Sequence, residues 1–460
     1  MAMSKAILLG NGVVVAGFSP SGAVQPRVIP GGAVVWRGER IVAVGTEAEL
    51  RRQFSDAEFL DACGGLILPG LINLHHHFYS ALACGLDPGA TLSNFTDVLD
   101  RLWWRLDRAL DFEAVRLSAQ LSVADCIRWG CTTVFDHHAS PSCLAGSLDA
   151  IADAVEASGL SAVLCYEVTD RNGHDQARAG IEENLRFIHQ QSSHPRIRGV
   201  LGLHASFTLR DETLAEAAKR RPEGAGCHIH LAEDPVDVEA SQRAFGLRPV
   251  ERLERFGLLD DRCLLAHGIH LEPDEYVNLA RNNAVLIHNP ESNANNAVGR
   301  LDVMEAANHG CLVGLGTDGM SSAMLRALRT AFLMHRAGRG DPSSGFKALP
   351  DLLSNNAKVA RRFFDEPLLG ELAQGAPADL IVVDAPPPTP IGPENLFSCL
   401  VYGISEAPVR HTVARGRLLL EDFRHRTLDP NQLAARARQL TPALWERFGA
   451  LKSGTNFLGD

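Results

Sequence analysis

Eight short apolar segments follow one another between residues 66 and 318, and helical stretches separate most of them. In those stretches, apolar residues recur at the spacing of an amphipathic helix. Alternating strands and helices predict βαβ units with a parallel sheet, and eight units over about 250 residues match a (β/α)8 TIM-like barrel. The predicted strands are Leu66–Leu74, Thr132–His137, Ser161–Val168, Arg198–Ala205, Ala225–Leu231, Cys263–His270, Asn283–His288 and Cys311–Asp318.

The segments on either side of the predicted barrel have the sequence character of β-strands. Residues 1–64 and 368–428 both contain short apolar runs broken by glycine, proline or asparagine. Neither segment is long enough to bury a core alone, so we expect the two to form one small composite β-sandwich. The barrel is assigned to residues 65–367, and residues 429–460 to a C-terminal helical tail with Pro430 in its first turn.

Charge and composition exclude several classes of protein. The chain has 44 Lys plus Arg and 55 Asp plus Glu, a net charge of −11, so nucleic acid is not an expected partner. Its ten cysteines form no CxxC pair, which predicts reduced, buried thiols. The longest uncharged stretch, Ala62–Leu86, contains Pro69 and three adjacent histidines, so it is not a membrane span. With no recognisable signal peptide, we expect a cytoplasmic protein.

Polar side chains gather at the ends of the predicted strands, where the active sites of (β/α)8 barrels lie. One buried histidine is usually an ordinary core residue, but each buried imidazole needs a hydrogen-bond partner. Such residues on most of the strands are better explained by a shared metal ion. The residues concerned are Asn73 to His77, Asp136 to His138, Tyr166, Glu167, His204, His228 to Glu233, His267, His270, His288, Asn289 and Asp318.

Strand alternation selects among these histidines only in part. His75 and His77 face the same side of their strand, and so do His228 and His230, so parity does not choose within the second pair. A mixed set of histidine and aspartate suits Zn²⁺ or Fe²⁺. Three or four protein ligands leave a position for a water molecule, whose pKa the metal lowers toward neutrality.

Four motifs then identify a resemblance. Leu68-Pro-Gly-Leu-Ile-Asn-Leu-His-His-His77, His230-Leu-Ala-Glu233, Ala266-His-Gly-Ile-His270 and Gly316-Thr-Asp318 occur in the order found in the amidohydrolase superfamily. The chain resembles its metal-dependent deaminase and chlorohydrolase branch. The resemblance implies one divalent metal, Zn²⁺ or Fe²⁺, held by His75, His77, His230 and Asp318. It also implies that Glu233 is the acid/base group and that His267 polarises the attacked carbon or orients the water.

Shorter segments are most similar to the SsnA-type aminohydrolases of that superfamily. These are Leu102-Trp-Trp-Arg105, Asp136-His-His-Ala-Ser140, Tyr166-Glu-Val-Thr-Asp170 and His288-Asn-Pro-Glu-Ser-Asn293. Members with two metals usually bridge them through a modified lysine at the fourth strand. The chain has only five lysines, and none lies in that strand. The nearest, Lys219, falls in a predicted helix, so we expect a mononuclear site.

The resulting hypothesis is hydrolytic deamination of a nitrogen heterocycle, such as a purine, pyrimidine, pteridine or triazine. Water activated by the metal attacks the carbon that bears the amino group, Asp318 takes a proton, Glu233 protonates the ring nitrogen, and His267 stabilises charge. His204 is expected to bind substrate. Further pocket candidates are Tyr166, Glu167, His137, Asn293 and Ser322, while His76, His138, His228 and His270 are expected to be structural.

The adjacent pair Trp103 and Trp104 cannot share one face of an α-helix, so we expect one to pack and the other to cover the pocket. Two other functions remain open from the sequence. One is removal of chloride or an alkylamine from a triazine-like ring by the same metal site. The other is a non-catalytic scaffold, against which the intact set of ligand and acid/base residues argues. The expected partners are a small heterocyclic substrate and further copies of the chain in a homo-oligomer.

Overall fold

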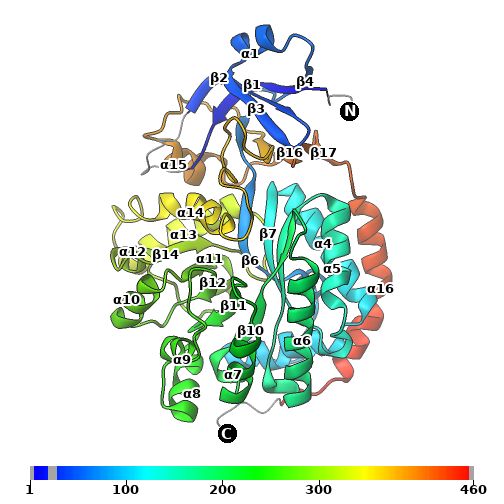
Figure 1. Ribbon diagram of the computed structural model, residues 1–460, viewed down its shortest axis with the longest axis vertical. Coiled ribbons are helices and arrows are strands. Elements are labelled where there is room, and N and C mark those ends of the chain that lie inside the picture. Colours follow the sequence, from blue (N-terminus) through cyan, green and yellow to red (C-terminus); the bar gives the residue numbers. More distant parts are fainter. Residues whose placement is uncertain (1–4, 19–27, 455–460) are drawn as a thin grey trace.

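The computed structural model describes residues 5–18 and 28–454. A small β-rich module lies at one end of a larger α/β body, and one long helix, α16 (Pro430–Ala450), runs along the side of that body (Figure 1). In the part of the chain that the structure describes, no helix combines the length and apolar character of a membrane span.

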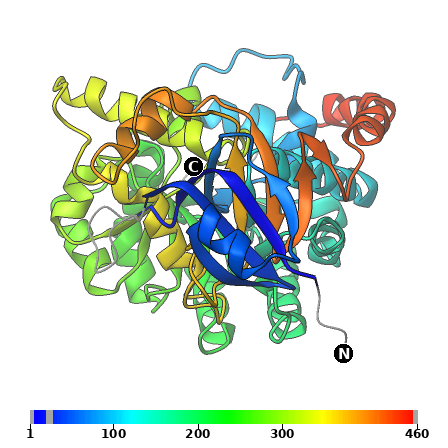
Figure 2. The same ribbon diagram turned by 90° about the horizontal axis from the view of Figure 1, so that it is seen from above.

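The β-rich module joins the two ends of the chain in one nine-stranded sheet. Figure 2 shows its N-terminal strands beside its C-terminal strands, above the α/β body. The connection is an antiparallel pairing in which Leu380 to Val383 lie opposite Pro69 to Leu66. The hydrogen bonds form one continuous sheet and do not divide it into the two layers of a sandwich. Its strands are β1 (Ile7–Val15), β2 (Val28–Arg37), β3 (Arg40–Thr46), β4 (Glu58–Asp61), β5 (Leu66–Pro69), β15 (Leu380–Val383), β16 (Val409–Ala414), β17 (Arg417–Glu421) and β18 (Arg424–His425).

The apolar segment read from the sequence as one strand, Leu66–Leu74, is divided at Gly70. Its first half, β5, belongs to the small sheet, and its second half, β6 (Leu71–His76), begins the α/β body. A Cβ atom at position 70 would lie 2.3 Å from Oγ1 of Thr132, so only glycine allows this close approach. The small sheet therefore extends a few residues beyond the predicted boundary at residue 64.

The α/β body contains two parallel sheets. Isolated bridges between His76 and Asp318 and between Val168 and Leu203 connect them at both junctions. The predicted fourth strand, Arg198–Ala205, is divided at Val200, with one half in each sheet. The first sheet contains β6, β7 (Cys131–His138), β8 (Ser161–Tyr166) and β9 (Ile197–Gly199); the second contains β10 (Leu201–Ala205), β11 (Cys227–Leu231), β12 (Cys263–His267), β13 (Val285–His288) and β14 (Leu312–Leu315).

Helices cover the parallel sheets and follow the strands along the chain (Figure 1). Local sequence fixes several of their ends: Asp111 accepts a hydrogen bond from the Ala114 N–H at the start of α4, and Gly159 ends α5 with a left-handed φ of 96°. The longer helices are α1 (Glu47–Gln53), α3 (Trp104–Ala109), α4 (Phe112–Arg128), α5 (Ser147–Ser158), α6 (His174–Gln190), α7 (Asp211–Arg220), α8 (Pro235–Phe245), α9 (Pro249–Arg255), α10 (Pro273–Arg281), α11 (Pro290–Asn295), α12 (Val303–Asn308), α13 (Met324–Arg339) and α14 (Leu352–Ala360).

Short helical turns complete the structure, several of them at strand ends. They are α2 (Phe95–Val98), α15 (Leu396–Ser398), the 3₁₀ turns η1 (Phe78–Ala83), η3 (Pro141–Cys143), η4 (Asp170–Asn172), η5 (Ser206–Thr208) and η6 (Leu349–Asp351), and the π-helical turns η2 (Leu99–Trp103) and η7 (Cys399–Ile404). The helical tail predicted from residue 429 is α16; its final residues, 455–460, lie outside the described part of the chain.

Candidate metal centre and active site

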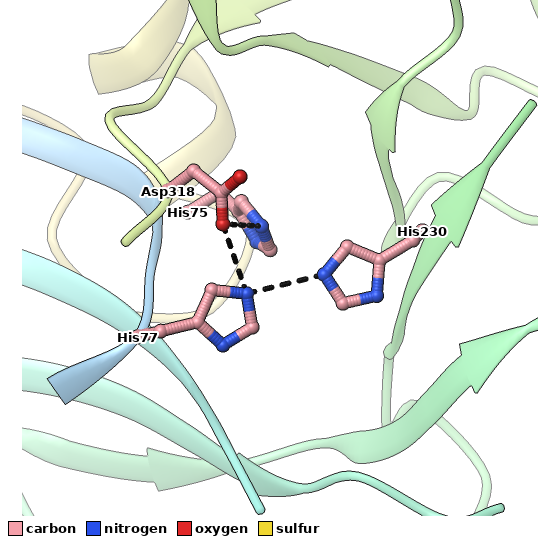
Figure 3. Close-up of side chains that lie close together, drawn as sticks. All are labelled: His75, His77, His230 and Asp318. Atoms are coloured by element: carbon pink, nitrogen blue, oxygen red, sulfur yellow. Dashed lines mark hydrogen bonds and ion pairs between the residues drawn. The ribbon is translucent and has the colours of Figure 1, made fainter. Parts of the chain in front are cut away.

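Four side chains from three strand ends converge at one edge of the parallel sheets. They are His75, His77, His230 and Asp318, and one nitrogen or oxygen of each lies within 4.8 Å of those of the other three. His77 Nε2 is 3.0 Å from Asp318 Oδ1 and 3.1 Å from His230 Nε2 (Figure 3). His75 Nε2 lies 3.4 Å from the same aspartate oxygen. The structure thus brings together the four residues proposed as ligands.

Hydrogen bonds on the far side of the rings explain why these nitrogens face one another. Nδ1 of His77 donates to the carbonyl of His137 at 2.6 Å, and Nδ1 of His230 donates to the carbonyl of His204 at 2.8 Å. In the neutral form of each ring, as a metal ligand requires, Nε2 then carries a lone pair and no hydrogen. The Nε2 atom of His75 is buried and has no hydrogen-bond partner.

These observations fit a bound metal ion. Histidine ligands commonly donate their other ring N–H to a carbonyl. Ligand atoms of a tetrahedral zinc site, at about 2.0–2.1 Å from the ion, lie about 3.3 Å from one another, close to the separations found here. Without an ion, buried lone pairs would face each other unsatisfied. Three imidazole nitrogens and one carboxylate oxygen suit a borderline divalent metal.

Glu233 and His267 lie beside Asp318. His267 Nε2 is 3.4 Å from Glu233 Oε2 and 3.8 Å from Asp318 Oδ2. Burial raises the pKa of Glu233 to about 7, and the neighbouring charge of Asp318 adds to this effect while His267 opposes it. The structure places a group that holds a proton near neutral pH next to the residues proposed as metal ligands.

The backbone is strained at this edge. Asp318, His267 and Ala232 adopt positive φ angles of 55°, 77° and 45°, which non-glycine residues rarely do. Such strain is found where the surrounding structure holds a functional side chain in place. Here it turns the chain sharply at three strand ends and directs the side chains toward the common centre.

A cavity of about 800 Å³, including its open mouth, lies over this centre. Its apolar wall includes Phe95, Leu99, Trp103, Trp104 and Phe207. The π-helical turn η2 ends at Trp103 and α3 begins at Trp104, and both indole rings line the cavity. Trp104 is almost fully buried, whereas Trp103 is only partly so; the sequence had indicated that only one of the two would reach the pocket.

His204 and Glu167 also line the cavity, as expected for substrate-binding residues. Burial lowers the pKa of His204 to about 3, so the ring is neutral. Burial opposes ionisation of Glu167, but His204, His137 and Arg171 outweigh it and hold the pKa of its carboxyl below the ordinary value. The carboxylate is therefore charged.

Tyr166 and Ser322, expected to be pocket residues, do not line the cavity. The ring of Tyr166 packs toward α6, since a Cβ at Gly180 would lie 3.2 Å from it. The reason is strand alternation, which directs Tyr166 and Glu167 to opposite sides. The hydroxyl of Ser322 is buried 3.2 Å from Cys126 Sγ and 3.4 Å from His76 Nε2, so it packs against the side of the strand away from the cavity.

His137 and Asn293 act behind the cavity wall. His137 Nε2 donates to the carbonyls of Leu203 and His228, and its Nδ1 lies 3.4 Å from Glu167 Oε2. Asn293 Oδ1 accepts a hydrogen bond from His267 Nδ1 at 2.8 Å. Both residues support neighbouring side chains and do not line the cavity themselves.

The histidines assigned a structural role have protein partners. His76 Nδ1 donates to the carbonyl of Asp318, His138 Nε2 pairs with Ser140 Oγ at 2.8 Å, and His228 Nε2 lies 2.9 Å from His75 Nδ1. His270 Nε2 donates to the carbonyl of Val298 at 3.1 Å. Of these, His228 orients a proposed ligand.

Sequence reasoning missed two polar residues near the centre. Ser292 donates to Asp318 Oδ2 at 2.5 Å, and Asn296 donates to Glu233 Oε1 at 3.3 Å. They stand four residues apart, which places them on one side of α11 and its end. Both residues follow the end of the seventh predicted strand, and that position could have identified them as candidates for the active site.

Comparisons with known proteins agree with this site. A family model described as the amidohydrolase family matches residues 66–419, and a model of the bacterial imidazolonepropionase-like composite domain matches residues 32–57. The chain is 32% identical over 458 residues to a 5-methylthioadenosine/S-adenosylhomocysteine deaminase of Syntrophobacter fumaroxidans, covering 96% of this chain and 99% of that protein. It is 31% identical to a 5'-deoxyadenosine deaminase of Methanopyrus kandleri, over 78% and 81% of the two chains.

A solved structure has the same fold. An adenosine deaminase from Xanthomonas campestris with bound zinc superposes with a TM-score of 0.82 and 24% sequence identity, covering 97% of this chain and 99% of that chain. The sequence predicted a metal-dependent hydrolase that acts on C–N bonds and deaminates a heterocycle. These likenesses confirm that prediction. The chain belongs to the amidohydrolase family.

Proposed function

We propose that the protein hydrolytically deaminates an amino-substituted purine or related heterocycle, with Zn²⁺ held by His75, His77, His230 and Asp318. The observation that carries the proposal is the convergence of these four residues, with Glu233 and His267 within 4 Å of one another beside Asp318. The zinc in the Xanthomonas deaminase supports zinc over iron(II). When bound, such an ion supplies Lewis acidity and lowers the pKa of a water molecule.

The reaction forms one C–O bond and breaks one C–N bond. Water adds to the carbon that bears the amino group, and Asp318 Oδ2 takes one of its protons. Glu233 delivers a proton to the adjacent ring nitrogen, and His267 stabilises the charge that develops at the attacked carbon. The amino group then takes the proton held by Asp318 and leaves as ammonia, while the proton of the new hydroxyl group returns to Glu233, so that the ring ends as the oxo product.

The cavity supports a planar aromatic substrate. Trp103, Phe95 and Phe207 offer ring faces and edges for stacking. The relatives named above act on adenosine derivatives, which makes aminopurines and their nucleosides the first substrates to test. Small changes in a pocket decide between heterocycles, so a likeness of 24–32% identity does not transfer the substrate itself.

We also propose that the two parallel sheets form a distorted (β/α)8 barrel, with residues 65–367 as its approximate extent. The bridges at both junctions of the sheets support this closure. The strands at the two ends of the chain form a companion module, here assigned to residues 1–64 and 368–428 together with β5, whose joint sheet supports a composite domain.

An ammonia-release assay with zinc-loaded protein tests the proposed reaction over adenine, adenosine, guanine, cytosine and melamine. We expect release from at least one of them. Glu233→Gln should lower turnover at least 100-fold while it keeps its zinc, because the amide cannot transfer the proton. Glu275→Gln is the matched control, since Glu275 is a buried carboxylate paired with Arg248 outside the cavity. Full turnover by the Glu233 variant would overturn the assigned role.

A further inference from the structure

A second group of polar side chains, besides Glu233 and the proposed ligands, faces the cavity. It consists of Glu167, which directly follows β8, and His204, in β10. Their relative exposures are 4% and 6%, yet both line the cavity. His204 Nε2 lies 3.9 Å from Glu167 Oε1, which is too far for a direct hydrogen bond. We call these two residues the acceptor pair.

The hydrogen bonds of His204 define which ring nitrogen faces the cavity as an acceptor. Its Nδ1 lies 2.6 Å from Thr208 Oγ1, and that hydroxyl donates its own hydrogen to the carbonyl of Ala205 at 3.1 Å. Nδ1 must therefore be the donor in the first contact. In the neutral imidazole, Nε2 then carries a lone pair and no hydrogen.

Glu167 presents further lone pairs beside that nitrogen. Arg171 Nη2 donates to its Oε1 at 3.1 Å and to Asp107 Oδ2 at 3.0 Å, and the guanidinium stacks on Trp104 at 4.5 Å. One arginine thus holds the carboxylate in place from behind. A carboxylate has about four lone-pair sites, so Glu167 retains acceptor capacity toward the cavity.

Two buried acceptors that face each other need hydrogen-bond donors between them. Among the described residues that line the cavity are the carboxylates Glu167, Glu233, Asp237 and Asp318, and no lysine or arginine is among them. A ring N–H group of a bound ligand, placed between the two, would supply such a donor. The described lining has no lysine or arginine to pair with a carboxylate or phosphate group on the ligand.

The position of the acceptor pair indicates which part of the substrate it would contact. Ligand-type atoms of Glu167, His204 and His230 all lie within 4.8 Å of one another, and His230 is a proposed metal ligand. This separation is about the width of one heterocyclic ring. A substrate placed for attack at the metal centre would present its ring, not a distant substituent, to Glu167 and His204.

We infer that the acceptor pair selects heterocycles with a ring N–H donor close to the reacting carbon, as in amino-oxo purines, over rings whose nitrogens are all acceptors. This inference rests on the proposed deamination and refines its substrate class. Guanine and isoguanine have such an N–H group, whereas adenine and the base of adenosine have acceptor nitrogens at the corresponding edge. The preferred substrate also carries no anionic group.

Matched substrates test the inference on the unmodified zinc-loaded enzyme. We expect kcat/KM for isoguanine to exceed that for adenine at least tenfold, and 1-methylguanine to react at least tenfold more slowly than guanine. Faster reaction with adenine or adenosine would overturn the inference and leave the deamination intact. Ammonia release from none of these compounds would instead contradict the proposed function.

The variant Glu167→Gln tests whether the acceptor pair causes the preference for substrates with a ring N–H group. In Glu167→Gln, we expect KM for the N–H-bearing substrate to rise about 10- to 100-fold with a smaller change in kcat, and the preference over its N-methyl analogue to disappear. Binding of the matching oxo product by calorimetry should weaken likewise. Glu275→Gln should keep the preference, because its carboxylate lies outside the cavity.

Metal analysis tests a competing explanation, in which the acceptor pair binds a second metal ion. If Glu167 and His204 instead held a second metal ion, the unmodified protein would contain two zinc ions per chain and Glu167→Gln would lose one. That result would overturn the inference. An unchanged content of one zinc ion, together with the lost preference, would support it.

Discussion

The hydroxyl of Ser292 donates to Oδ2 of Asp318 at 2.5 Å, while Oδ1 of the same carboxylate lies 3.0 Å from His77 Nε2. The two oxygens therefore have different environments. One faces the proposed metal ligands, and the other is held by a neutral donor on the side of Glu233 and His267. This division lets one side chain bind a metal and exchange a proton.

Ser292→Ala should separate the two roles of Asp318. Loss of the hydrogen bond raises the pKa of the carboxyl, so we expect kcat to fall about tenfold and the acidic limb of the pH profile to move upward. Zinc content should not change, because Oδ1 is unaffected. Ser354→Ala, a buried serine that bonds to a helix carbonyl elsewhere, is the control. Loss of zinc from the Ser292 variant would contradict this prediction.

Asn293 determines which nitrogen of His267 faces the reaction centre. We expect Asn293→Ala to lower kcat about 10- to 100-fold with zinc retained, because the ring loses its 2.8 Å hydrogen bond and its fixed orientation. Asn293→Asp should restore part of the rate and move the basic limb of the pH profile upward, since a carboxylate stabilises the imidazolium form. Equal losses in both variants, with no shift of the pH profile, would argue against an orienting role.

Removal of the metal should abolish activity and lower the thermal stability. Binding at a free zinc concentration 100 times the Kd stabilises the folded protein by about 2.7 kcal/mol, so the apo protein should melt at a lower temperature. His230→Ala should melt at the same temperature with and without zinc. Calorimetric scans with a chelator and with added zinc check this, and a Tm that does not respond in the unmodified protein would contradict the assigned ligands.

Asp107 should make stability depend on pH. Burial raises its pKa to about 6, although Arg171 opposes the shift. Between its ordinary pKa near 4 and this value, the folded protein keeps a proton that the unfolded chain releases. The free energy of unfolding should therefore fall as pH rises from 4 to 6 and level off above 6. This contribution is on the order of 3 kcal/mol.

Asp107→Asn removes the titrating group and serves as the comparison. Relative to the unmodified protein, the variant should gain stability as pH rises from 4 to 6. Urea unfolding of both proteins without metal measures the difference at each pH. A difference that stays constant over this range would disprove the assignment.

The C-terminal helix α16 supports the wall of the cavity. Arg105, one residue beyond the cavity-lining Trp104, stacks on Phe448 at 4.0 Å and donates to its carbonyl at 3.0 Å. We expect Arg105→Ala to cost about 1–2 kcal/mol of unfolding free energy and to raise KM more than it changes kcat. Steady-state kinetics and urea unfolding measure both. Arg51→Ala is the control, because Arg51, in α1 far from the cavity, also stacks on a phenylalanine ring, that of Phe59. An unchanged KM would show that α16 has no influence on the cavity.

The sequence determined the order of strands and helices and a set of candidate residues for the proposed metal centre. Period-two and period-3.6 apolar patterns are local, so they marked the strands and the long helices. Position at the strand ends, which must lie at a common edge, gave a wider set of polar candidates, and the family resemblance selected His75, His77, His230 and Asp318 from it. The resemblance supplied the choice of His230 over His228, which strand parity left open; the structure has His230 facing His77 and His228 behind His75.

Only the tertiary structure decided what each remaining side chain reaches. Gly70 divides one apolar run between two sheets because Thr132, distant in the sequence, leaves no room for a side chain. Ser322 turns away from the cavity and Ser292 turns toward Asp318, although both are serines near a strand end. Hydrogen bonds between residues far apart in the chain leave no periodic pattern in the sequence. The acceptor pair and the arginine that holds it could therefore be identified only from the structure, in which the strands lie side by side.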